Sequence, residues 1–170
     1  MPQFLDDLSH ALIDAALKAG AQAADAIAIR GQSVIVDMRG GTLEQAERAE
    51  GTDIGLRVLI GGRQANVSAS DTRPETIEAL AARAVAMANE APEDPHAGLA
   101  APDQIARNWD LAGLELCDPA PEPAPDALMR VAREAEVAAF AVEGVSQVQS
   151  ASASYSHNAA HIAASNGFSG

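Results

Sequence analysis

The chain has 170 residues, 48% of them apolar, which is enough for one globular domain with its own core. Its 11 Lys and Arg face 24 Asp and Glu, giving a net charge of −13, so direct binding to nucleic acid or to an anionic membrane is not expected. Cys117 is the single cysteine, which excludes an internal disulfide, and the amino terminus lacks the basic region of a signal peptide and carries Asp6 and Asp7 instead. No apolar run approaches the roughly 20 residues of a membrane helix, so we expect a cytoplasmic protein.

Residues 4–19 are predicted to form a helix because apolar side chains recur there at helical spacing. Gly20 is placed to end this helix. The glycine-flanked segments 24–30 and 33–39 are rich in Ala, Ile and Val, which predicts two strands of a hairpin. The composition of Thr42 to Glu50 favours a helix, but its position between strands favours a strand, which we prefer.

Residues 51–90 give the clearest pattern in the chain. Alternating apolar residues predict a strand up to Ile60, a two-residue turn at Gly61-Gly62 and a return strand up to Ala69. Thr72-x-x-Glu75 resembles a capping box, and an apolar stripe predicts a helix after it, formed by Ile77, Leu80, Ala81, Ala84, Val85 and Ala88. Arg57 lies within the first of these strands, where a solvated side chain is the preferred interpretation and a buried or interface ion pair the alternative.

Residues 91–125 hold most of the prolines and are predicted to be an extended connection. Four large apolar side chains could anchor this connection to the domain: Trp109, Leu111, Leu114 and Leu116. A helix is predicted over 126–143, with an apolar stripe of Leu128, Val131, Ala135, Ala138 and Val142. Residues 145–156 and 159–165 are predicted to be two strands joined by a turn at His157-Asn158.

These elements predict an α+β fold, a mostly antiparallel sheet with three main helices packed on it. Residues 1–90 would form its first part, residues 91–125 the proline-rich connection, and residues 126–170 the helix and strand pair that complete the same domain. The sequence ends at Ser165-Asn-Gly-Phe-Ser-Gly170, just after a turn signal and with no closing element, which suggests a fragment of a longer protein that lacks a carboxy-terminal domain.

We expect no catalytic, cofactor-binding or metal-binding residue in this chain. His157 and His161 have the spacing of a helical zinc motif, but Asn158 stands where that motif has its Glu, and residues four apart on a strand lie about 13 Å apart. Two solvated histidines are the preferred interpretation. The glycines form neither a phosphate loop nor a dinucleotide motif, and acidic neighbours disfavour a reactive thiolate at Cys117.

The order of several short motifs resembles the amino-terminal domain of the TldD/PmbA family, also called peptidase U62 or "modulator of DNA gyrase". The similarity rests on D-I-G-L-R-V (53–58), the turn G-G-R (61–63), S-A-S-D (68–71) and the alanine-rich helix after them. The segments E-D-P-H-A-G-L (93–99), W-D-L (109–111), C-D-P (117–119) and S-N-G (165–167) are similar to the PmbA (TldE) branch.

This resemblance implies a heterodimer of a TldD-like and a TldE-like subunit that acts as a metallopeptidase on peptides, with zinc held by an HExxxH helix of the TldD-like partner. The present sequence contains no HExxxH, so it would be a noncatalytic component. The alternative is a stand-alone module that binds a peptide, a protein or a second copy through a sheet edge. Direct action on DNA, which the family's older name suggests, conflicts with the net charge.

Overall fold

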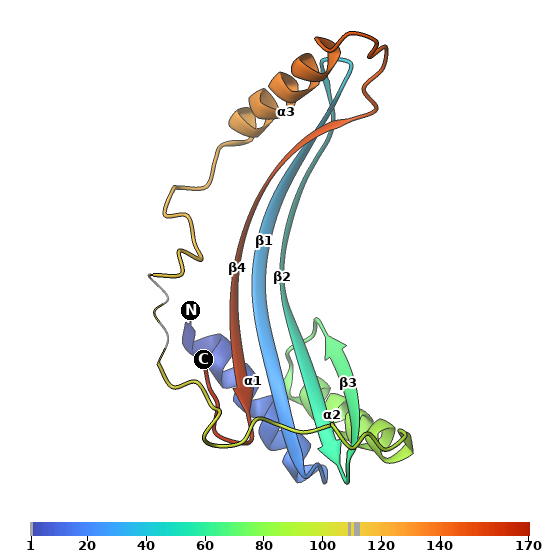
Figure 1. The fold of residues 1–170 in the computed structure, drawn as a ribbon, viewed down its shortest axis with the longest axis vertical. Helices are drawn as coiled ribbons and strands as arrows, with labels where there is room; N and C mark the ends of the chain where they lie inside the picture. Colours follow the sequence, from blue (N-terminus) through green and yellow to red (C-terminus); the bar gives the residue numbers. More distant parts are fainter. Residues whose placement is uncertain (1, 109, 111–112) are drawn as a thin grey trace. The chain divides into compact units, whose positions relative to one another are not determined.

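The computed structural model describes residues 2–108, 110 and 113–170. Its elements are α1 (Pro2–Lys18), β1 (Ala23–Arg39), β2 (Thr42–Ile60), β3 (Arg63–Ala69), α2 (Pro74–Glu90), α3 (Pro125–Phe140) and β4 (Ala151–Ala164). The strands form one antiparallel sheet in the order β3-β2-β1-β4 (Figure 1). The α+β class with three helices is therefore confirmed.

The chain divides into two compact units, each built from separate stretches of sequence. The first unit comprises residues 1–30, 51–110 and 159–170, and the second comprises residues 31–50 and 111–158. Strands β1, β2 and β4 each contribute residues to both units. None of the helices in the described part of the chain is long and apolar enough to cross a membrane.

In the first unit, α1 and α2 cover one face of the sheet. Alternate strand residues point to that face because successive side chains of a strand lie on opposite sides. The buried core combines Leu8 and Leu12 of α1 and Ile77, Leu80 and Ala84 of α2 with Ala24, Ala26, Ala28, Ile54, Leu56 and Val58 of the sheet. Burial of each large aliphatic side chain contributes about 1.5–3 kcal/mol. Alanines at the β1 positions leave room for the helices to pack closely.

The hairpin between β2 and β3 has the predicted two-residue turn. Gly61 and Gly62 have φ angles of 56° and 77°, a conformation that glycine adopts without strain. The pairing register then places Ile60 opposite Arg63 and Arg57 opposite Asn66.

The predicted capping box before α2 is wrong. Pro74 begins the helix, so Arg73 occupies the N-cap position, where it makes no side-chain cap bond, and Thr72 lies one residue too early to cap. Asp71 instead organises the helix entry, because its carboxylate accepts the Arg73 backbone N–H and the Thr76 hydroxyl.

In the second unit, α3 packs on β1 through Leu128 and Ala132, which contact Val34, Val36 and Met38. The predicted stripe on this helix is wrong beyond Leu128, since Val131 and Val142 are 48% and 59% exposed. The buried side of α3 ends at Glu136, which is 2% exposed. Its carboxylate accepts the backbone N–H groups of Gly40 at 2.6 Å and Gly41 at 2.8 Å, at the turn between β1 and β2.

The strands are longer than the sequence predicts. Thr42 to Glu50 is a strand, as preferred, but residues 24–39 form part of one strand rather than a hairpin. The turn predicted at His157-Asn158 is also wrong, because both residues lie within β4. A Cβ on Gly31 would lie 2.4 Å from Oδ1 of Asn158, so this glycine serves a close contact rather than a turn.

No helix or strand is assigned to the described residues of the 91–124 connection. Leu114 and Leu116 are 59% and 71% exposed, so they are not the anchors that the sequence predicts. The other two predicted anchors, Trp109 and Leu111, lie outside the described residues. Polar contacts fix the early part of the connection instead, because the Asp94 backbone N–H bonds to the Gly62 carbonyl and the Asn166 side chain bonds to the Ala100 carbonyl.

Candidate functional site

A cleft of about 590 Å³ lies in the first unit, on the sheet face away from α1 and α2. Residues 91–108 cross this face in front of the strands (Figure 1). Strand alternation turns Asp25, Ile27 and Arg57 toward the cleft. The remaining wall comes from the crossing segment and from the end of the chain, with Ala100, Gln104, Ile105, Ala106, Ile162, Asn166 and Phe168 among the lining residues.

An ion pair forms the polar floor of the cleft. The Arg57 Nε donates to Oδ1 and Oδ2 of Asp25 at 3.2 and 3.0 Å, and Nη2 also contacts Oδ2. The hydrogen bond with the Asp25 side chain raises the pKa of Arg57 above its usual range. The two side chains are 33% and 26% exposed, so the sequence alternative of a partly buried ion pair replaces the solvated interpretation.

Glycine keeps part of the floor flat beside this pair. A Cβ on Gly55 would lie 3.0 Å from Cγ2 of Ile27, so a larger residue would push the isoleucine aside. Gly55 therefore allows a close approach between the two strands. On the neighbouring strand, Asn66 pairs with Arg57 in the β2–β3 register.

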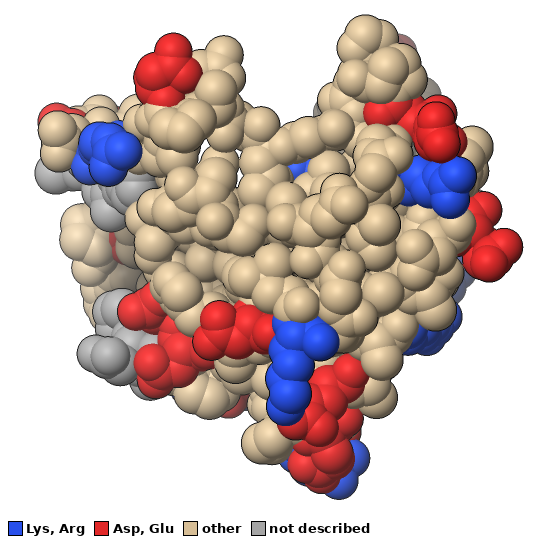
Figure 2. All heavy atoms as spheres, turned by 90° about the horizontal axis from the view of Figure 1, so that it is seen from below, with Lys and Arg blue, Asp and Glu red and all other residues tan. Residues whose placement is uncertain are grey.

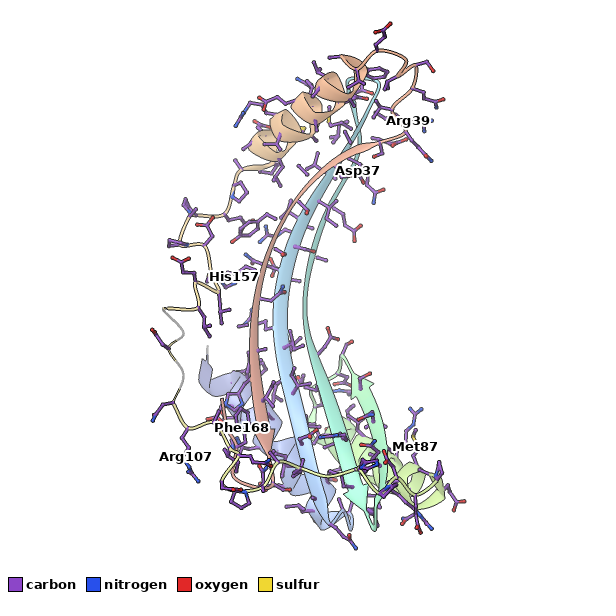
Figure 3. All side chains as sticks on the ribbon, in the orientation of Figure 1. Asp37, Arg39, Met87, Arg107, His157 and Phe168 are labelled. Carbon is purple, nitrogen blue, oxygen red and sulfur yellow. The ribbon has the colours of Figure 1, made fainter. Side chains whose placement is uncertain are left out.

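The wall is mainly apolar and is held by amide side chains. Asn166 donates to the Ala100 carbonyl at 2.9 Å and accepts the Phe168 backbone N–H at 3.2 Å. Gln104 accepts the Ala101 N–H at 3.0 Å. Phe168 lies beside the end of β4 (Figure 3). The described lining therefore combines one ion pair, three amide side chains and apolar side chains, and it includes no Ser, Cys, His or Lys.

A second polar group joins α1 to β4 and was not predicted from the sequence. Ser9 is fully buried, donates its hydroxyl to the Asp6 carbonyl at 2.9 Å and lies 2.8 Å from Nδ1 of His161. The Asp6 carboxylate lies 3.5 Å from Nε2 of the same ring and 2.8 Å from Nδ1 of His10. The Ser9 hydroxyl thus donates its proton to a backbone carbonyl, and its oxygen is buried from solvent. Ser9, Asp6 and His161 therefore hold α1 on the sheet, and the Ser9 hydroxyl is not available as a nucleophile.

The other residues considered from the sequence as candidate site residues lie outside the cleft. His157 is exposed on the part of β4 that belongs to the second unit. Cys117 is an exposed free cysteine in the connection. The His96 backbone N–H bonds to the Asp94 side chain in a turn. Sequence periodicity marks strands and helices but carries no signal for the cleft, because the crossing segment has no regular pattern.

Charged side chains lie at the margins of one face of the molecule, and its centre is uncharged (Figure 2). Figure 2 shows a face whose centre is uncharged, with acidic and basic side chains at its margins and no continuous basic area. In the first unit, Arg63 and Arg73 pair with the acidic residues Glu93 and Asp71.

The helix-backed sheet with its cleft is an α+β domain. Residues 24–88 match the family model described as PmbA/TldA metallopeptidase domain 1, which confirms the resemblance to the amino-terminal domain of the TldD/PmbA family. A search of curated proteins gives no match.

Several solved structures share the fold, among them the following three. A protein from Bacteroides thetaiotaomicron described as a modulator of DNA gyrase has 21% identity and a TM-score of 0.71, over 96% of this chain and 37% of that one. TldE from Thermococcus kodakarensis has 16% identity and a TM-score of 0.72, over 96% and 36%. A gyrase-modulator protein from Thermotoga maritima has 15% identity and a TM-score of 0.59, over 96% and 36%. The chain thus spans little more than a third of the structures it matches.

The metal that a metallopeptidase family implies does not fit the residues present. No group of three His, Cys, Asp or Glu in the described part of the chain is arranged to hold a metal ion. His161, the one histidine of the 157/161 pair in the first unit, is already engaged by Ser9.

Proposed function

We propose that this chain is the amino-terminal domain of a PmbA/TldE-like, noncatalytic component of a cytoplasmic metallopeptidase system that processes peptides. The observation that carries the proposal is the match of residues 24–88 to the first metallopeptidase-family domain, together with the fold shared with TldE. Zinc and the catalytic groups would come from a TldD-like partner subunit. The present chain would supply subunit contacts and part of the surface that holds the peptide.

The residue chemistry of the described sites supports a noncatalytic role. The cleft has an internally neutralised ion pair and amide side chains, which can orient a bound chain. The Ser9–His161 contact is closed and structural. A peptidase activity of the complex would therefore depend on the partner.

The test is co-expression with the TldD-like subunit of the same genome. We expect the two chains to co-purify, and peptide cleavage to require both chains and zinc. The matched control replaces the Glu of the partner's HExxxH motif with Gln, which should abolish cleavage without preventing co-purification. Zinc-dependent cleavage by the present chain alone, or failure of the two chains to associate, would contradict the proposal.

A stand-alone binding module that uses a sheet edge is the second candidate. Strand β3 ends the sheet order, and Asn66, Val67 and Ser68 line a groove of about 330 Å³ with Arg83 and Met87 of α2. Met87 lies on α2 near this edge (Figure 3). Added strands pair through main-chain hydrogen bonds, so Val67→Pro should abolish peptide binding or self-association at this edge. Unchanged association of Val67→Pro in sedimentation experiments would exclude this use of β3.

A further inference from the structure

We propose that the cleft in the first unit binds a short, extended, electrically neutral peptide segment with apolar side chains. This inference rests on the proposed function, which makes a peptide the substrate class, and it assigns the binding to a defined surface of this chain. The cleft volume of about 590 Å³ falls within the range of small-molecule and peptide pockets.

The apolar wall determines which side chains would be accepted. Ile27 and Ile162 line the cleft from the sheet, Ile105 from the crossing segment and Phe168 from the end of the chain. Ile162 is 42% exposed, which leaves apolar area available for contact. Burial of an apolar ligand side chain against this wall would provide the main favourable term, at about 25 cal/mol per Å² of apolar area.

The polar floor determines which backbone groups would be accepted. An arginine side chain has five N–H donors, and Arg57 uses Nε and one N–H of Nη2 toward Asp25 and one N–H of Nη1 toward Gln64. Two of its N–H groups are left for a ligand carbonyl. Asn66 lies opposite Arg57 in the β2–β3 register and is exposed in the cleft lining, and its side-chain amide can both donate to and accept from a peptide main chain.

The charge balance excludes strongly charged ligands. Asp25 neutralises Arg57, and no other Lys or Arg is among the described residues that line the cleft. Arg107, the nearest cation along the crossing segment, points away from the sheet (Figure 3). A phosphate or a free carboxylate would lose hydration without gaining a free cation, whereas a peptide amide would be satisfied by the Arg57 and Asn66 groups.

The crossing segment is held in place before any ligand arrives. The Asp94 N–H bonds to the Gly62 carbonyl at 2.8 Å, and the Asn166 side chain holds Ala100 at 2.9 Å. A wall that is already ordered removes part of the entropy cost of binding.

The test is an NMR titration of the 170-residue chain with the blocked peptide acetyl-Leu-Ala-Leu-amide. We expect saturable shifts at the Gly55 N–H, the Asn66 side-chain amide and the Arg57 Nε–H. Ala106→Trp should fill the cleft and weaken binding about tenfold, the loss expected when one apolar side chain is displaced. Ala135→Trp is the matched control, because Ala135 is also exposed but lies on α3, and it should leave binding unchanged.

The same titration uses acetyl-Leu-Ala-Leu with a free carboxylate, which we expect to bind more weakly than the amide. Absence of saturable shifts, shifts confined to other residues, or equal binding by wild type and Ala106→Trp would overturn the assignment. Tighter binding of the free acid would overturn the neutral-ligand argument. Since the partner subunit is absent from this experiment, its outcome is independent of co-purification, and either proposal can fail alone.

Discussion

The buried carboxylate of Glu136 gives the sharpest test of packing in the second unit. It is 2% exposed and accepts two backbone N–H groups, from Gly40 and Gly41. In Glu136→Gln the side chain keeps its shape, but one carboxylate oxygen is replaced by an NH2 group. This donor then faces a backbone N–H donor, so one of the two hydrogen bonds cannot form. A hydrogen bond to a charged group contributes about 1.5–3 kcal/mol, so loss of one bond and weakening of the other should cost about 2–3 kcal/mol.

The matched control is Glu134→Gln on the same helix. Glu134 is 64% exposed and pairs with Arg130, a contact that is worth about 0.3–0.5 kcal/mol. Urea unfolding followed by circular dichroism gives the free energy of unfolding of each variant. Hydrogen exchange of the Gly40 and Gly41 backbone amides measures the local effect. We expect the exchange rate to rise about 30-fold to 150-fold in Glu136→Gln and to stay unchanged in Glu134→Gln.

Two results would refute this reasoning. The first is a free energy of unfolding for Glu136→Gln within about 0.5 kcal/mol of that for Glu134→Gln, which would mean that water replaces the carboxylate at little cost. The second is unchanged exchange at both glycines, which would show that the turn is held without Glu136.

Three further predictions concern the first unit. A double-mutant cycle of Arg57→Ala and Asp25→Ala should give a coupling of about 1–2 kcal/mol in urea unfolding, and a coupling near zero would contradict a stabilising pair. Hydrogen bonding to Arg73 holds the pKa of Asp71 well below its ordinary value of 3.8. The ionised Asp71 carboxylate therefore stabilises the folded protein fully above pH 3.8, and this contribution is lost progressively as the pH falls below 3.8 toward the lower pKa of the folded state. The difference in Tm between wild type and Asp71→Asn should therefore shrink below pH 3.8, and a difference that persists unchanged to pH 2 would refute it. Leu12→Ala, at a fully buried position, should cost about 3 kcal/mol, and a cost below 1 kcal/mol would argue against the α1 packing.

Local rules predict the elements whose signals lie within a few residues. The α2 stripe and the Gly61-Gly62 turn are where the sequence places them, because apolar period and positive φ are local properties. The fold class follows from these elements. The capping box fails for a reason that is also local, since Pro74 takes the first helical position and displaces Thr72 from the cap.

Long-range contacts explain the other errors. Gly31 reads as a break in the sequence, yet it lies inside β1 because the Asn158 side chain approaches it from a distant part of the chain. The α3 stripe is misplaced because a charged residue, Glu136, is buried to meet the Gly40-Gly41 turn. The cleft depends on a crossing segment without periodicity, so the sequence does not predict it; Arg57 indicates only an ion pair, and that as the less favoured of two interpretations.

The strand order has a consequence for synthesis of the protein on the ribosome. Strand β4 is the neighbour of β1, although the Ala24–Ser165 contact that joins their ends spans 141 residues. The helices α1 and α2 and the hairpin of β2 and β3 can assemble as soon as they emerge, whereas one edge of β1 waits unpaired until β4 is made. Unpaired strand edges are sites of aggregation during folding. We therefore expect the nascent chain to need protection at β1 during elongation, and synonymous changes that slow translation between β1 and β4 to lower its yield.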